Sequence, residues 1–159
     1  MTDQPLFLVT DSRHFNVTYQ INPWMRPEAW QADPASLGAA AVQSTALLRA
    51  ALEKAGARIE TIPPVEHLPD LVFPANAAIV LDGRALVARF RHAERQGEEA
   101  IFHRAFMGLK MRGLLSEVVE LPEGVLQEGA GDCIWDADRS FFWAGYGQRS
   151  TENSPSPEP

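Results

Sequence analysis

Two acidic residues flank a glycine-rich segment near the end of the chain, Glu128-Gly129-Ala130-Gly131-Asp132. Small residues between the acids allow a tight turn, so that the carboxylates can come close to a bound group. Paired carboxylates bind cations or take part in acid–base chemistry, and acids in turns are also often purely structural. The segment is therefore a candidate site for a cationic ligand, with structural turn acids as the alternative.

Other polar residues could act with this segment. Asp70 and Asn76 bracket a short segment between predicted elements, and Asp70 can accept charge-assisted hydrogen bonds while Asn76 can both donate and accept. Arg95 comes just before a predicted helix and Arg149 follows two loop glycines, so either guanidinium could bind a carboxylate bidentately. The alternatives are turn residues for the first pair and a solvated basic stretch with local Arg–Glu pairs for Arg95.

The chain has one cysteine and four histidines. Cys133 starts an apolar predicted strand with no histidine near it in sequence, so we interpret it as a buried thiol and not as a nucleophile. The histidines are scattered and give no zinc-type spacing, and we expect each of them at the surface: His14, His67, His92 and His103. We expect neither a metal nor a cofactor.

Composition narrows the class of protein. With 159 residues, 45% hydrophobic and 22% charged, the chain matches a soluble globular domain that can bury a core. Its net charge of −7 argues against binding to nucleic acid or to anionic membranes. No apolar run approaches the roughly 20 residues that span a bilayer, and the first residues carry no signal-peptide pattern. We expect a cytoplasmic protein.

Hydrophobic periodicity and turn signals predict the elements that would position these residues. Strands are predicted at 6–10, 58–62, 77–81, 84–88, 117–121, 133–136 and 140–144, and helices at 36–55 and 97–112. The dipeptide Asp82-Gly83 predicts a hairpin, and 11–30 is predicted to be a structured loop. A ββαβ-like unit recurs with a period of about 55 to 60 residues. Residues 151–159 contain three prolines and no core-forming residue, so they are predicted to be disordered.

Five segments resemble motifs of the guanidino-group-modifying (pentein) superfamily, whose members include arginine deiminases, dimethylarginine dimethylaminohydrolases and amidinotransferases. In family order they are Ile21-Asn22-Pro23-Trp24-Met25, Asp70-Leu-Val-Phe-Pro-Ala-Asn76, Glu94-Arg95-Gln96-Gly97-Glu98, Glu128-Gly-Ala-Gly-Asp132 and Gly145-Tyr-Gly-Gln-Arg149-Ser150. Each motif is modest, but all five in order over residues 6–150 are specific, and they look most like the arginine dihydrolase/dimethylargininase branch. The resemblance implies an α/β fold, a five-bladed α/β propeller, with residues 1–150 as its first half and 151–159 as a non-family tail.

The resemblance also implies roles for single residues. Glu128 would be the catalytic-site carboxylate that grips the substrate guanidinium, while Arg95 and Arg149 would bind the substrate α-carboxylate. The further substrate-binding residues it implies are Asn22, Asp70, Phe73, Asn76 and Asp132. Many relatives carry an acid where this chain has Asn76, and asparagine there resembles the branch that takes arginine through to ornithine.

The family reaction needs two more groups, a cysteine thiolate that attacks the guanidinium carbon and a histidine that acts as acid and base. Both normally lie in the second half of the fold. The resemblance therefore implies a hydrolase of arginine or methylarginine, giving ornithine or citrulline, whose Cys and His are missing from this chain. The alternatives are an inactive arginine-binding module and a split enzyme completed by a separate C-terminal half. An opened propeller would expose strand edges and apolar surface, so we also expect self-association.

Overall fold

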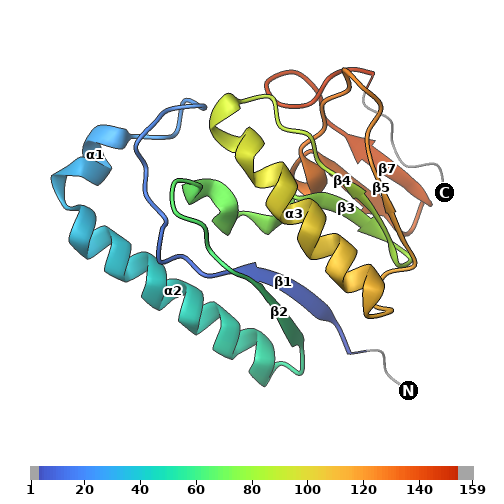
Figure 1. Cartoon of the computed structure of the whole chain (residues 1–159), viewed down its shortest axis with the longest axis horizontal. Helices are drawn as coiled ribbons and strands as arrows, with labels where there is room; N and C mark the ends of the chain where they lie inside the picture. The colour runs from blue at the N-terminus through green and yellow to red at the C-terminus, as the bar shows by residue number, and fades with distance from the viewer. Residues whose placement is uncertain (1–3, 154–159) are drawn as a thin grey trace. The chain divides into compact units, whose positions relative to one another are not determined.

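The computed structural model describes residues 4–153, which divide between Val72 and Phe73 into two compact units, 4–72 (unit 1) and 73–153 (unit 2) (Figure 1). The strands are β1 (Leu6–Thr10), β2 (Arg58–Ile62), β3 (Ala78–Leu81), β4 (Arg84–Val87), β5 (Glu117–Val119), β6 (Cys133–Asp136) and β7 (Phe141–Ala144). The α-helices are α1 (Pro27–Ala32), α2 (Pro34–Lys54) and α3 (Ala93–Met111), and the short 3₁₀ helices are η1 (Pro69–Val72), η2 (Pro74–Asn76) and η3 (Gly129–Gly131). No helix in this described part has the length and apolar character needed to cross a membrane.

Unit 1 is a β-α-β arrangement. Strands β1 and β2 pair in parallel, with Leu6 opposite Arg58, and α1 and α2 form the crossover that a parallel pair requires. The Asp33 side chain caps α2 by accepting a hydrogen bond from the Ser36 backbone N–H at 3.2 Å. At the other end, Gly56 adopts a φ of +91°, which is the left-handed helix stop expected of this residue.

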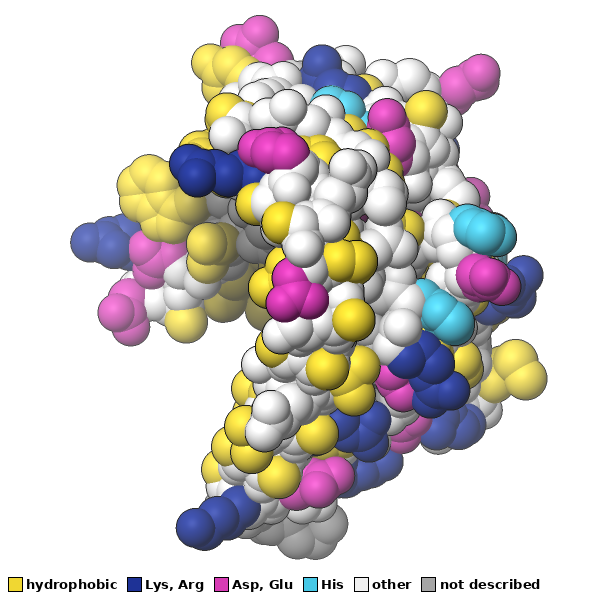
Figure 2. All heavy atoms as spheres, turned by 90° about the vertical axis from the view of Figure 1, so that its left-hand side faces the viewer, with side chains coloured by type: hydrophobic (Ala, Val, Ile, Leu, Met, Phe, Trp, Pro, Cys, Tyr) yellow, Lys and Arg dark blue, Asp and Glu magenta, His cyan; other side chains and the backbone are white. Residues whose placement is uncertain are grey.

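The loop predicted over 11–30 was wrong at its end, because α1 begins at Pro27. Proline at the first helical position and Glu28 in the first turn are helix-start signals, and they outweigh the aromatic character of this stretch. Helix α2 begins two residues earlier than predicted and has no buried residue; its exposed large hydrophobic side chains are Leu37, Val42, Leu47 and Leu48. Figure 2 looks onto the side that carries α1 and α2, where hydrophobic side chains gather at the surface.

Unit 2 repeats the β-α-β arrangement. The β3–β4 hairpin turns at Asp82 and Gly83, whose φ angles of +48° and +75° are those of the predicted tight turn. Strand β5 pairs in parallel with β4, and α3 packs against both. The core lies under α3, which buries side chains at helical spacing against the sheet: Phe102, Phe106 and Leu109.

Helix α3 begins at Ala93, four residues before the predicted start. The start of this helix was predicted too late for two reasons. His92 provides no side-chain cap, and Gly97 suggested a helix boundary although it lies inside the helix. Arg95 therefore lies in the first turn of α3 and not before the helix. This shift places Arg95 and Glu98 three residues apart on one helical face.

Strands β6 and β7 form a separate antiparallel pair, at the positions of the strands predicted at 133–136 and 140–144. Over residues 4–153 the sheets have two, three and two strands, and none closes on itself. The α/β class and the order of elements agree with the sequence, and the parallel β-α-β unit occurs twice. The propeller is not confirmed and stays a prediction.

Candidate functional site

The glycine-rich segment forms a tight turn that reaches the end of η2. Helix η3 (Gly129–Gly131) closes with a hydrogen bond from the Asp132 N–H to the Gly129 carbonyl at 3.1 Å. Gly129 has a φ of +67°, and a Cβ there would lie 2.6 Å from the Ala75 carbonyl oxygen. A Cβ on Gly131 would collide with the Asn76 amide. Both glycines are therefore needed for the turn to pack directly on Asn76.

Glu128 is the most deeply buried acid of this turn, with 1% of the residue exposed. Its Oε1 accepts the Arg91 backbone N–H at 3.3 Å. Its Oε2 is buried and has no hydrogen-bond partner among the described residues; an Arg149 Nε lies 3.9 Å away. Burial raises the pKa of Glu128, against the lowering by the Arg91 hydrogen bond and by the charges of Arg95 and Arg149.

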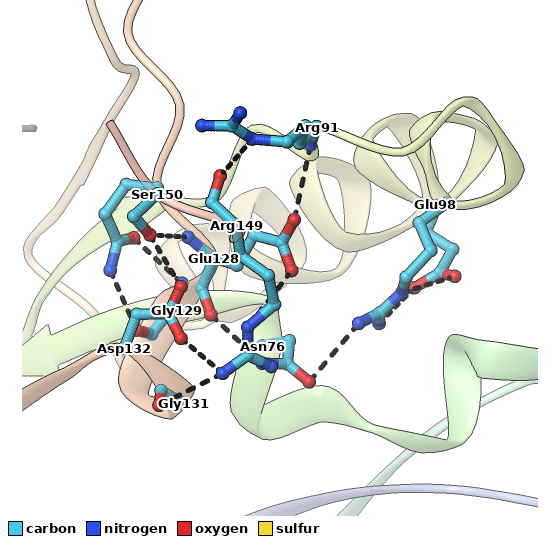
Figure 3. Close-up of polar contacts among 11 residues, drawn as sticks. Asn76, Arg91, Glu98, Glu128, Gly129, Gly131, Asp132, Arg149 and Ser150 are labelled. Atoms are coloured by element: carbon cyan, nitrogen blue, oxygen red, sulfur yellow. Dashed lines mark hydrogen bonds and ion pairs between the residues drawn. The ribbon is translucent and has the colours of Figure 1, made fainter. Parts of the chain in front are cut away.

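Asp132 is held by two partners at the other end of the turn. Arg149 Nη2 donates to its Oδ1, and the Ser150 hydroxyl donates to its Oδ2 at 2.6 Å. The Ser150 oxygen in turn accepts the Glu128 backbone N–H at 3.2 Å. Ser150 thus connects the two acids, and we define Glu128, the turn and Asp132 together as the clamp (Figure 3).

The side-chain amide of Asn76 forms hydrogen bonds through both its nitrogen and its oxygen. Its Nδ2 donates to the Glu128 carbonyl at 3.1 Å, and its Oδ1 accepts from Arg95 Nη1 at 3.3 Å. Arg95 forms a bidentate pair with Glu98, with distances of 3.0 and 2.7 Å, and its guanidinium lies 4.3 Å from the centre of the Phe90 ring. Side-chain exposures of 5% and 0% make this a buried ion pair.

These contacts bear on the two readings of Arg95. A local Arg–Glu pair was the structural alternative, and the structure contains such a pair, although it is buried and not solvated. Arg95 is joined to the clamp by hydrogen bonds through the Asn76 amide. Binding of a substrate carboxylate by Arg95 stays a prediction, and its geometry is that of a residue that holds others in place.

The remaining residues predicted to bind substrate are Asn22, Asp70 and Phe73. Asn22 and Asp70 belong to unit 1, where Asn22 Oδ1 accepts the backbone N–H groups of Trp24 and Met25 at 3.0 and 3.1 Å. Asp70 is 5% exposed in η1, and Phe73 is 45% exposed before η2. Their role in substrate binding stays a prediction.

Three residues that hold the clamp were assigned no role from the sequence, although two of them lie within the quoted motifs: Arg91, Glu98 and Ser150. The Arg–Glu spacing of three residues was a signal for Glu98, and the hydroxyl next to Arg149 was a signal for Ser150. Arg91 acts through its backbone N–H, so its side chain carried no signal for that contact, and its Nε donates to the Arg149 carbonyl at 3.1 Å.

Cys133 is 2% exposed, and burial, together with the charge of Asp132, raises the pKa of its thiol. A thiol in that state is a poor nucleophile, in agreement with the sequence interpretation. His92 differs from expectation, because its Nε2 is buried and lacks a hydrogen-bond partner within residues 4–153. The described residues contain no group of His, Cys, Asp and Glu that could hold a metal ion.

A surface pocket of about 320 Å³ also lies in unit 2, beside α3 and the end of β5. Its lining includes Arg89, Glu99, His103 and Glu120, and none of the predicted site residues. The clamp, with two carboxylates and a backbone carbonyl converging on one guanidinium, is thus the better candidate for recognition of a planar cation.

No family model matches the chain. It is 39% identical over 154 residues to the bifunctional arginine dihydrolase/ornithine cyclodeaminase AgrE of Nostoc sp., which covers 97% of this chain and 20% of that protein. It is 31% identical over 148 residues to the N(G),N(G)-dimethylarginine dimethylaminohydrolase of Mycobacterium tuberculosis, covering 93% of this chain and 44% of the relative. The chain thus spans between a fifth and a half of the length of these relatives.

The chain also resembles solved structures of arginine dihydrolases and of a dimethylarginine dimethylaminohydrolase. A complex of an AgrE variant with L-arginine matches with a TM-score of 0.78 and 36% identity, over 96% of this chain and 21% of the other. The substrate-bound N-terminal domain of ArgZ, described as an arginine dihydrolase from cyanobacteria, matches with a TM-score of 0.74 and 32% identity, over 93% and 51%. A dimethylarginine dimethylaminohydrolase at 19% identity and a TM-score of 0.69 shares the fold.

Proposed function

We propose that this chain supplies the cation-binding part of a hydrolase. Its homologues are guanidino-group-modifying enzymes of the pentein superfamily, and it matches only their N-terminal part. The substrate would be a guanidino amino acid, arginine or methylarginine, whose C–N bonds are cleaved. The chain would bind and orient the guanidinium group, and the groups that attack it would come from elsewhere.

The observation that carries this proposal is the unpartnered Oε2 of Glu128. A buried acceptor without a donor is unfavourable, and an ionised one is more so. A guanidinium presents five N–H donors in a planar fork, so it can supply both the missing hydrogen bond and a compensating charge. A bound cation would also favour the ionised form of Glu128, which burial alone disfavours.

Catalysis by this chain alone is not part of the proposal. The family reaction requires a thiolate, and Cys133 is a buried thiol whose pKa is raised. Conversion of arginine to ornithine, in preference to deimination to citrulline, rests on the resemblance at Asn76. In the structure the amide of Asn76 joins Arg95 to the Glu128 carbonyl, so Asn76 would act by placing these groups.

A second polypeptide is the partner that the surface of unit 2 favours. One face of the β6–β7 hairpin carries Ile134 and Trp143, which are 63% and 60% exposed and lie opposite each other; the Phe141 ring meets the Trp143 ring edge-on. Clustered apolar side chains of this kind mark interaction surfaces. We propose that a separate C-terminal half or a second copy of the chain covers this face, in the cytoplasm.

Calorimetric titration of L-arginine into the chain, alone and after addition of the second half of a relative's domain, tests the clamp. Glu128→Gln should abolish binding, and it should lower turnover of the completed enzyme by orders of magnitude, because a neutral amide cannot offset the substrate charge. Glu123→Gln, at an exposed position before the same turn, is the control. Equal binding by both variants would refute the assignment of Glu128.

A further inference from the structure

We infer that the clamp is already occupied by a guanidinium of the chain itself, the side chain of Arg149, which a ligand must displace. The inference rests on the proposed function, since it concerns the same carboxylates. Arg149 would compete with the ligand for these carboxylates, and this competition would determine which guanidino compounds the site accepts.

The contacts of Arg149 are those that a ligand guanidinium would make. Its Nη2 donates to Asp132 Oδ1 and lies 3.5 Å from the Gly131 carbonyl, and its Nε is 3.9 Å from Glu128 Oε2. A Cβ built on Gly131 would lie 3.7 Å from this Nη2 and would also collide with the Asn76 amide. The guanidinium of Arg149 therefore lies among the residues that the sequence assigns to substrate binding (Figure 3).

The two sides of this contact differ in how far their side chains are exposed and in the hydrogen bonds that hold them. The carboxylates are fixed, because Glu128 is held through Arg91 and Ser150, and Asp132 through Ser150. Their side chains are 1% and 10% exposed, whereas the Arg149 side chain is 42% exposed. The arginine can thus move into solvent while the clamp keeps its shape, as a preorganised receptor requires.

The Arg139–Asp136 pair shows what an ordinary ion pair looks like in the same unit. Arg139 Nη1 lies 2.9 Å from Asp136 Oδ2, and the arginine side chain is 66% exposed. Only one carboxylate meets it, and no buried unpartnered oxygen lies beside it among the described residues. Arg149 instead meets two acids and a carbonyl, so the clamp has more negative charge than its own arginine neutralises.

Displacement of Arg149 has a consequence for selectivity. A ligand without a carboxylate, such as guanidinium or agmatine, must break the Arg149–Asp132 contact and offers the freed arginine no anionic partner. A ligand that also carries a carboxylate can pair with the freed guanidinium. Competition by Arg149 would therefore favour arginine over agmatine by more than the carboxylate contact alone.

Chemical rescue tests the occupancy. Arg149→Ala should lower the Tm, and millimolar guanidinium chloride should raise it again with saturation, because the free cation binds only the folded clamp. Arg139→Ala is the matched control and should not respond, and equal concentrations of sodium chloride and urea control for salt and denaturation. If Arg149→Ala does not fold, Arg149→Gln keeps the side-chain stem and opens the same clamp.

Equal responses of the Arg149 and Arg139 variants to guanidinium would overturn the inference. Agmatine affinity is the second readout: it should rise in the Arg149 variant, and the arginine-to-agmatine affinity ratio should fall. If arginine binds and depends on Glu128 but rescue fails, the internal competitor is wrong and the proposed function stands. If rescue succeeds but the completed enzyme binds no guanidino amino acid, the proposed function fails and the internal contact stands.

Discussion

Glu98→Gln is the substitution whose effect follows most directly from the structure. The Glu98 carboxylate is fully buried and accepts two hydrogen bonds from Arg95, at 3.0 and 2.7 Å. Glutamine has the same shape but is neutral and has only one acceptor oxygen. The substitution therefore removes the Glu98 charge from beside the buried Arg95 guanidinium, together with one of their two hydrogen bonds.

Removal of one partner from a buried ion pair typically lowers the free energy of unfolding by about 3–5 kcal/mol, because the other charge remains buried and uncompensated. Retention of one acceptor and of the Phe90 ring under the guanidinium places Glu98→Gln at the lower end, about 3 kcal/mol. The Arg139–Asp136 pair at the surface has the same sequence spacing, and Arg139→Ala should destabilise the chain far less than Glu98→Gln.

Urea unfolding followed by tryptophan fluorescence measures this difference. Trp135 and Trp143 lie in unit 2, so replacing Trp24 and Trp30 by Phe restricts the signal to that unit. The double replacement Arg95→Met/Glu98→Leu should cost less than Glu98→Gln alone, because it removes both buried charges. A loss of stability for Glu98→Gln no larger than that for Arg139→Ala would refute the buried pair.

Three further predictions concern the turn and the surface. Gly129→Ala should lower the free energy of unfolding by about 1–3 kcal/mol more than Gly124→Ala. Both glycines have a positive φ, but of the two only Gly129 has neighbouring backbone within 4 Å of an added Cβ. Urea unfolding compares the two variants, and equal losses would contradict the close approach. Burial raises the folded-state pKa of Glu128, so the chain should lose stability as the pH rises from the unfolded pKa of Glu128 through its folded pKa. Glu128→Gln should remove this loss in a series of Tm measurements against pH. Parallel curves for the two proteins would contradict this role of Glu128. The chain should self-associate in light scattering, and Ile134→Lys or Trp143→Lys should weaken this, whereas a monomer at high concentration would exclude an exposed interface at this hairpin.

The sequence predicted most strands because their signals are local. Asp82-Gly83 specifies a tight turn whatever the remainder of the chain does, and β1 and β2 follow from short apolar or alternating runs. Helix starts were less well predicted. Helix α1 is short, and α3 begins without a side-chain cap, so packing of its apolar face decides where it starts.

The candidate site was predictable in its residue types and not in its connections. The two acids and the small residues between them indicated a cation-binding turn, because these features are contiguous in the sequence. Whether Arg95 and Glu98 are buried or solvated depends on packing around Phe90, which no local pattern reveals. Ser150 could not be predicted as the connection between the acids, since that role requires the chain to return to the turn.

The return of the chain to the clamp has a consequence for the order of events in folding. The hydrogen bond between Asn76 and the Glu128 carbonyl joins residues 52 apart, and the one between Arg91 and the Arg149 carbonyl joins residues 58 apart. Contacts of such separation form late, because the intervening loop must be closed first. During synthesis the helices and hairpins can form as they are made, whereas the acids become fixed only when Arg149, Ser150 and Thr151 arrive, the last by bonding to Leu126. The clamp thus takes its final geometry in one late step, after most of the secondary structure is in place.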